Sequence, residues 1–166
     1  MTAAAPVAAG PVTQIAWVTE NIAATETLLR AQFGCGPWTR IPEVHFGPAH
    51  CTFRGAPADF TVHVSLAYLG DLQLELIEPV SGDSIYTEFL AHNRPGLHHL
   101  CFEVDDLAAA CERAEAAGLP VLQSGSMLEG AMEFAYLDGS SAGAPYVELA
   151  RIGPQMQAFY DAVKNA

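Results

Sequence analysis

Apolar and polar residues alternate along several short runs of the chain, and this period of two predicts β-strands. The runs are residues 12–18, 61–68, 71–77, 97–104, 121–124, 132–137 and 145–150. Leu69 and Gly70 join two of the runs, which indicates a hairpin. Residues 38–57 are rich in Pro, Gly and His, and we expect one irregular strand and a loop there.

Other segments have helical spacing and follow residues that favour a helix start. Thr19 or Asn21 is a suitable cap for a helix over residues 22–33, and Asp105 or Asp106 for one that ends near Ala117. A short helix is expected around residues 85–92. A last amphipathic helix, with proline in its first turn, is expected over residues 154–165.

The two halves of the chain repeat each other. Residues 14–24 align without a gap with residues 99–109, and residues 74–76 match residues 147–149, each a glutamate between aliphatic residues. Each half has the order strand, helix, then three strands. We therefore predict an α+β fold in which two tandem βαβββ modules form a curved, mixed or antiparallel sheet around a cavity.

The repeat also sets the expected organisation of the chain. The predicted units are a flexible leader (1–11), a first module (12–79), a connector (80–95), a second module (96–151) and a C-terminal helix (152–166).

Alternation along each strand assigns its residues to two faces. We expect the large apolar residues, among them Val62, Val64 and Leu66, to pack against the helices. The polar residues between them then line the cavity. These are Gln14, His63, Gln73, Glu75, His99, Cys101, Tyr146 and Glu148.

Four residues of that set form symmetric pairs, Gln14 with His99 and Glu75 with Glu148. Two carboxylates in a half-enclosed cavity repel each other and lose hydration, and a divalent cation relieves both problems. One imidazole, one amide and two carboxylates suit zinc, cobalt, nickel, manganese or magnesium. A single strand Glu or His is more often solvated or hydrogen-bonded than a ligand, so the prediction depends on the joint pattern.

The composition narrows the class of partner. A net charge of −12 argues against nucleic acids and anionic membranes, which attract basic surfaces. No run of about 18 apolar residues is available to span a membrane. The start of the chain does not resemble a signal peptide, and the four cysteines lack disulfide-scaffold spacing, so we expect a cytoplasmic protein with reduced thiols.

Two motifs carry a resemblance to a known family. Residues 96–106 (GLHHLCFEVDD) and 75–79 (ELIEP) are similar to the vicinal oxygen chelate superfamily, also called the glyoxalase, bleomycin resistance and dioxygenase superfamily. Within it, the chain is most similar to methylmalonyl-CoA epimerases, and its metal set resembles that of glyoxalase I.

The resemblance implies metal ligands at Gln14, Glu75, His99 and Glu148, with Gln14 where epimerases usually carry His. It implies Glu148 as one catalytic base and places the second near His63. Gln73, Cys101 and Tyr146 are expected to line the substrate pocket. His98, the neighbour of His99, is expected to point to the opposite face as a structural residue.

The expected function is that of a metal-dependent epimerase, isomerase or lyase acting through a metal-chelated enolate or enediolate of a small carbonyl substrate, such as a thioester. One alternative is a non-catalytic binding or resistance-type protein. A second is an extradiol-type dioxygenase, which Gln14 in place of a first His disfavours. We expect a homodimer, and specificity contacts from Trp38, Arg40, His45 and Phe46.

Overall fold

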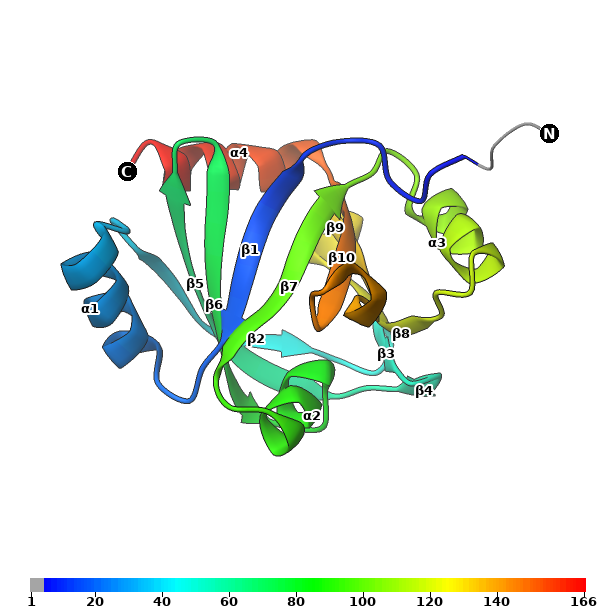
Figure 1. Cartoon of the computed structure of the whole chain (residues 1–166), viewed down its shortest axis with the longest axis horizontal. Coiled ribbons are helices and arrows are strands. Elements are labelled where there is room, and N and C mark those ends of the chain that lie inside the picture. The colour runs from blue at the N-terminus through cyan, green and yellow to red at the C-terminus, as the bar shows by residue number, and fades with distance from the viewer. Residues whose placement is uncertain (1–4) are drawn as a thin grey trace.

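The structure, a computed structural model, describes residues 5–166 and shows a curved sheet with helices around it (Figure 1). The strands are β1 Val12–Val18, β2 Thr39–Phe46, β3 Cys51–Phe53, β4 Ala56–Pro57, β5 Phe60–Leu69, β6 Leu72–Ser81, β7 Gly96–Glu103, β8 Val121–Met127, β9 Met132–Asp138 and β10 Tyr146–Ile152. The α-helices are α1 Ile22–Phe33, α2 Ile85–His92, α3 Leu107–Ala116 and α4 Pro154–Lys164. Two short 3-10 helices occupy Leu128–Gly130 and Ser140–Ala142.

The described strands form one mixed sheet in the order β2-β5-β6-β1-β7-β10-β9-β8-β3-β4. β1 is parallel to β6 and antiparallel to β7, and β7 is in turn parallel to β10. The order β1, β6, β5, β2 in one half therefore matches β7, β10, β9, β8 in the other. This arrangement confirms the predicted α+β fold of two βαβββ modules around a curved sheet.

Capping residues place the first helix of each module where the sequence predicts it. The Asn21 side chain accepts a hydrogen bond from the Ala24 backbone amide, and Asp106 does the same for Ala109. α1 contacts β5 and β6, and α3 contacts β8, β9 and β10. These two helices cover the outer, convex side of the sheet (Figure 1).

The main hydrophobic core lies inside the curve. Phe46 stacks on Phe60 with ring centroids 4.9 Å apart, and Phe134 meets Phe46 edge-on at 5.5 Å. α2 adds Tyr86 and Phe89 to the same cluster and closes one end of the curved sheet. Burying each large apolar side chain contributes about 1.5–3 kcal/mol, so this cluster helps to hold the two modules together.

Two expectations were wrong. Residues 38–57 hold three strands rather than one, because β3 pairs with β8 at the far edge of the sheet. That contact joins segments distant in sequence, and local pattern does not reveal it. The inner side of the sheet is also not left free, since α4 packs there with Met156 and Val163 buried.

Among residues 5–166 the structure contains no helix that is both long enough and apolar enough to cross a membrane.

Candidate metal and substrate site

The four predicted ligands lie on four neighbouring strands at the middle of the sheet. Glu75 is on β6, Gln14 on β1, His99 on β7 and Glu148 on β10. Ala16 of β1 pairs with both Glu75 and His99, and its methyl group leaves room for the two larger side chains to converge. The duplicated register of the modules thus brings one ligand from each of these strands to a single point.

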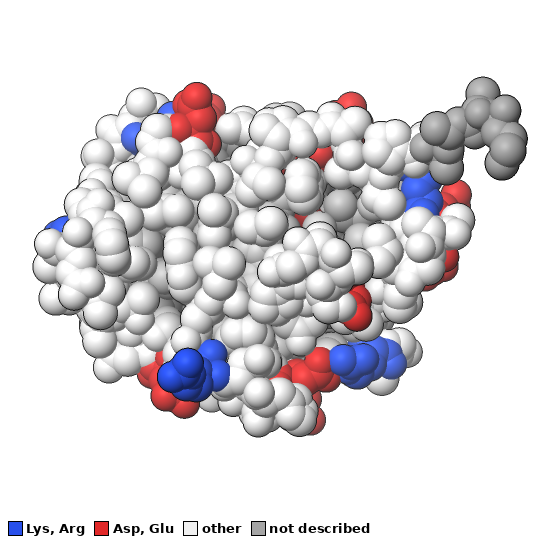
Figure 2. All heavy atoms as spheres, viewed as in Figure 1, with Lys and Arg blue, Asp and Glu red and all other residues white. Residues whose placement is uncertain are grey.

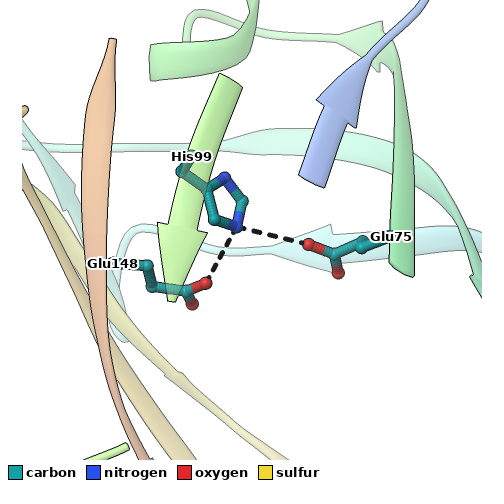
Figure 3. Close-up of side chains that lie close together, drawn as sticks. All are labelled: Glu75, His99 and Glu148. Carbon is teal, nitrogen blue, oxygen red and sulfur yellow. Dashed lines mark ion pairs between the residues drawn. The ribbon is translucent and has the colours of Figure 1, made fainter. Parts of the chain in front are cut away.

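The ligand atoms gather around Nε2 of His99 (Figure 3). This nitrogen lies 3.0 Å from Oε2 of Glu148, 3.1 Å from Oε1 of Gln14 and 3.5 Å from Oε2 of Glu75. One ligand atom each from Glu75, His99 and Glu148 lies within 4.8 Å of the others. The predicted ligands are therefore brought together, and all four come from a single chain.

The electrostatics of the cluster favour a cation. Burial alone would lower the pKa of His99, but its hydrogen bonds to Glu148 and Glu75 and their negative charge raise it to about 9. Burial and the charge of Glu148 raise the pKa of Glu75, although His99 opposes this. With a pKa of about 9, His99 is protonated at neutral pH, and its positive charge offsets part of the negative charge of the two buried carboxylates.

The donor set passes a test of fit for a metal ion. One imidazole nitrogen, one amide oxygen and two carboxylates, all inward-facing, match the preferences of zinc and neighbouring first-row metals. Within residues 5–166, the ion pairs of Glu75 and Glu148 are with His99 alone. A divalent cation would take over the role of the His99 proton.

Comparisons with known proteins identify the family of the chain. The sequence profile of the Glyoxalase/Bleomycin resistance protein/Dioxygenase superfamily matches residues 13–136. The chain belongs to this superfamily.

The relatives matched in sequence are named as acyl-CoA epimerases. The chain is 40% identical over 81 residues, 46% of its own length, to an ethylmalonyl-CoA/methylmalonyl-CoA epimerase of Cereibacter sphaeroides. It is 44% identical over 50 residues, 30% of this chain and 28% of the relative, to a mitochondrial methylmalonyl-CoA epimerase of Mus musculus. The matched part covers only 60% of the first relative.

Solved structures support the fold. A methylmalonyl-CoA epimerase from Mycobacterium tuberculosis superposes with a TM-score of 0.64 at 17% identity, over 95% of this chain and 97% of that one. A methylmalonyl-CoA epimerase in complex with methylmalonyl-CoA and NH4+ gives a TM-score of 0.59 at 21% identity, over 86% and 94%. At these identities the similarity establishes the fold alone.

His98 lies on the same side of the sheet as His99, so the expectation that it points away was wrong. The pairing of β1 with β7 moves from His99 directly to Leu97, which leaves His98 as the extra residue of a β-bulge. Its ring lies 5.2 Å from that of His99 and 4.5 Å from that of Tyr146. A bulge interrupts strict alternation and re-aims a side chain, which the sequence pattern does not show.

The two histidines also share a hydrogen bond, with their Nδ1 atoms 2.9 Å apart. Burial and the nearby charge of His99 lower the pKa of His98 well below its usual value, so this ring is neutral. The Nδ1–H of His99 therefore donates to Nδ1 of His98, which leaves Nε2 of His99 facing the carboxylates. His98 fixes the orientation of the candidate ligand beside it.

The structure does not bring His63 to the site. Leu66 pairs with Glu75 across β5 and β6, so Val62, Val64 and Leu66 share the inner face with Glu75. His63 lies on the outer face, where its Nδ1 accepts a hydrogen bond from the Glu43 backbone amide. The assignment of faces on this strand was wrong because the cavity wall is itself apolar and takes the aliphatic side of the strand.

The three predicted substrate contacts have different positions. Gln73 accepts a hydrogen bond from Gln14 at 2.5 Å, and Cys101 lines the same polar cavity. Burial, and then the negative charge of Glu148, raises the pKa of the Cys101 thiol well above its usual value, so the thiol is neutral. Tyr146 lies outside this cavity, where its hydroxyl donates to Glu88 of α2 at 3.3 Å.

Of the residues that the 38–57 segment was expected to contribute, only Phe46 lines a cavity beside the ligands. Trp38 donates to the Cys35 carbonyl, Arg40 pairs with Glu26, and His45 contacts Asp59. The expected specificity contacts of these three residues are therefore not visible in the structure.

Two cavities adjoin the ligands. The first is polar, about 150 Å³ in volume, and includes Gln14, Gln73 and Tyr68. The second is mainly apolar, about 80 Å³, and reaches Glu75 and Glu148.

On the face in Figure 2 the basic atoms form small separate patches, several of them beside acidic atoms, and uncharged surface predominates.

Proposed function

We propose that this glyoxalase-superfamily protein is a metal-dependent isomerase of the epimerase type, acting on a small carbonyl compound. The observation that carries the proposal is the convergence of Gln14, Glu75 and Glu148 on Nε2 of His99. The names of the curated relatives support an acyl-CoA thioester as the first substrate to test.

Gln14, Glu75, His99 and Glu148 would hold the ion. When bound, it supplies positive charge that stabilises negative charge on the substrate oxygens. Gln14 is uncharged, and His99 is neutral when it binds a metal, so the charge of the ligand set comes from the two carboxylates alone. A doubly charged ion therefore neutralises the buried cluster.

Proton movement falls to the two carboxylates. Glu148 and Glu75 reach Nε2 of His99 from β10 and β6, which lie on either side of β7 in the sheet (Figure 3). A substrate carbon held beside the ion can lose its acidic proton to Glu148 and regain one on its other face from Glu75. Burial raises the pKa of Glu75, which makes it a stronger base than a carboxylate in water. His63, the base expected from the resemblance, has no part in this scheme.

The first test is metal content and proton exchange. Protein purified without a histidine tag should contain close to one divalent ion per chain by elemental analysis. In D2O it should exchange the α-proton of methylmalonyl-CoA or ethylmalonyl-CoA, followed by proton NMR. Glu148→Gln should lose most of the exchange and part of the metal. A fully active Glu148→Gln variant with unchanged metal would reject the assignment.

The absence of His63 from the site favours a second candidate, a binding protein of the same superfamily without catalysis. Such a protein would bind acyl-CoA, detected by isothermal titration calorimetry, yet show no α-proton exchange with any metal supplied. The predicted homodimer is a separate question, because the proposed site is complete within one chain. Light scattering coupled to size-exclusion chromatography tests it.

A further inference from the structure

Helix α4 lies over the inner face of the sheet and contributes to both cavities beside the ligands. Met156, Phe159 and Tyr160, spaced as one helical face, line the apolar cavity. Gln157, Asp161 and Lys164, on the adjacent face, line the polar cavity. Among the residues of α4, Tyr160 alone lines both.

The candidate ligands are divided between the same two cavities. Gln14 faces the polar one, and Glu75 and Glu148 face the apolar one. Tyr160 and Met132 are shared, and the Tyr160 hydroxyl donates to the Met132 sulfur at 3.6 Å. This contact therefore forms the partition between a polar compartment and an apolar compartment, both open to one cluster of ligands.

We infer that α4 is part of the substrate site, and that Met156 and Tyr160 limit the apolar substituent of the substrate to a short alkyl group. The reaction at that substituent rests on the proposed function, whereas the size limit rests on the cavity alone. The polar remainder of the substrate would lie along Gln14 and Gln73 on the other side of Tyr160.

The volume of the apolar compartment sets the size of the group. At about 80 Å³ it is roughly half of an engineered apolar cavity that binds benzene, about 150 Å³. A group of roughly two to four carbon atoms fits such a space. The lining is aliphatic, aromatic and methionine side chains apart from the carboxylates, so a charged or strongly polar substituent would lose its hydration there.

Methionine positions allow this inference to be tested on metal-free protein. Met127, Met132 and Met156 all line the apolar compartment, so their methyl carbons report its occupancy. Protein carrying [13C-methyl]methionine is titrated with straight-chain primary alcohols from ethanol to octanol and followed by NMR. In the wild type, affinity should rise about fourfold per added carbon and then stop rising near four carbons.

Three variants distinguish a direct role of α4 side chains in the cavity wall from a general destabilisation of the helix. Met156→Ala and Tyr160→Val should move the chain-length limit upward by one or more carbons. Val163→Ala is the matched control, because Val163 is buried on the same helix and lines neither cavity. It should destabilise α4 and leave the limit unchanged.

Several results would overturn the inference. These are an affinity that rises through octanol in the wild type, methionine signals that respond to none of the alcohols, or an equal shift of the limit in all three variants. Cobalt(II) titration of the same samples, read by visible absorption, tests the metal site separately. A protein that binds no cobalt yet shows the chain-length limit would contradict the proposed function and keep the role of α4.

Discussion

Replacement of His98 tests how the structure orients its candidate metal ligand. The bulge in β7 places Nδ1 of His98 2.9 Å from Nδ1 of His99. His98→Phe keeps a ring of similar size in this aromatic environment and removes the acceptor. His98→Asn retains an acceptor oxygen near the position of Nδ1 but removes ring volume. The two variants should therefore have opposite effects on metal affinity and on stability.

The expected loss of metal affinity in His98→Phe follows from the protonation of His99 with and without metal. In metal-free His98→Phe, His99 can give up its Nδ1 proton and keep the proton on Nε2, which donates a hydrogen bond to Glu148 3.0 Å away. A metal on Nε2 forces the proton to stay on Nδ1, where no acceptor remains. An unpaired buried donor costs about 1–3 kcal/mol, so metal affinity should fall about 5- to 150-fold. Loss of such outer partners elsewhere costs about 10- to 100-fold, which is consistent.

Competition with a chromophoric chelator measures the affinity, and thermal unfolding of the metal-free protein measures stability. His98→Phe should lose metal affinity and keep its unfolding temperature within a few degrees. His98→Asn should keep metal affinity within about threefold and lose about 1–3 kcal/mol of stability to the cavity it leaves. The reasoning is refuted if folded His98→Phe binds zinc as tightly as the wild type.

Three further predictions concern pH and stability. Although burial opposes it, Arg40 lowers the pKa of Glu26, so this pair contributes stability above the unfolded pKa of about 4.3 that is lost as pH falls through the folded value. The free energy of unfolding of Glu26→Gln should therefore be about 1–3 kcal/mol lower than that of the wild type at neutral pH. Urea titrations should show this difference narrowing below about pH 4. Because the pKa of His99 is raised to about 9, a metal ion must displace its proton. Zinc affinity should therefore rise about tenfold per pH unit up to that value. Equal zinc affinity at about pH 7 and 9 would contradict this. Gly82→Ala, with φ of +81° and no space for a methyl group, should cost more than about 2 kcal/mol by calorimetry, whereas Gly118→Ala, with φ of +80° and open space, should cost about 1 kcal/mol.

Elements that depend on local pattern could be predicted from the sequence. Val12–Val18, Ile22–Phe33 and Ile85–His92 lie where alternation, caps and helical spacing place them. Segment 38–57 could not be predicted in the same way. β2 pairs with β5 of its own module, but β3 pairs with β8 of the other module, and this second contact forms only when the two modules are packed.

The candidate ligands could be predicted from the sequence because the duplication preserves the strand register as well as the order of the elements. Gln14 and His99 occupy matching positions on β1 and β7, and Glu75 and Glu148 occupy matching positions on β6 and β10. Matching positions on paired strands of a symmetric sheet face the same side. His98 escapes this rule, since one extra residue in β7 turns its ring toward the site without any mark in the hydrophobic pattern.

The errors at β5 and α4 have one physical cause. Alternation shows that a strand has an apolar face, but not whether that face meets a helix or a cavity. The inner surface of this sheet is apolar beside the polar ligands. The face of β5 that carries Val64 therefore turns inward, and His63 lies on the outer face. For the same reason the inner surface requires a cover, and the Met156 and Tyr160 face of α4 supplies one. An apolar interior next to a charged cluster weakens the hydration of the carboxylates, and under the proposed function the same apolar surface would receive a small organic group.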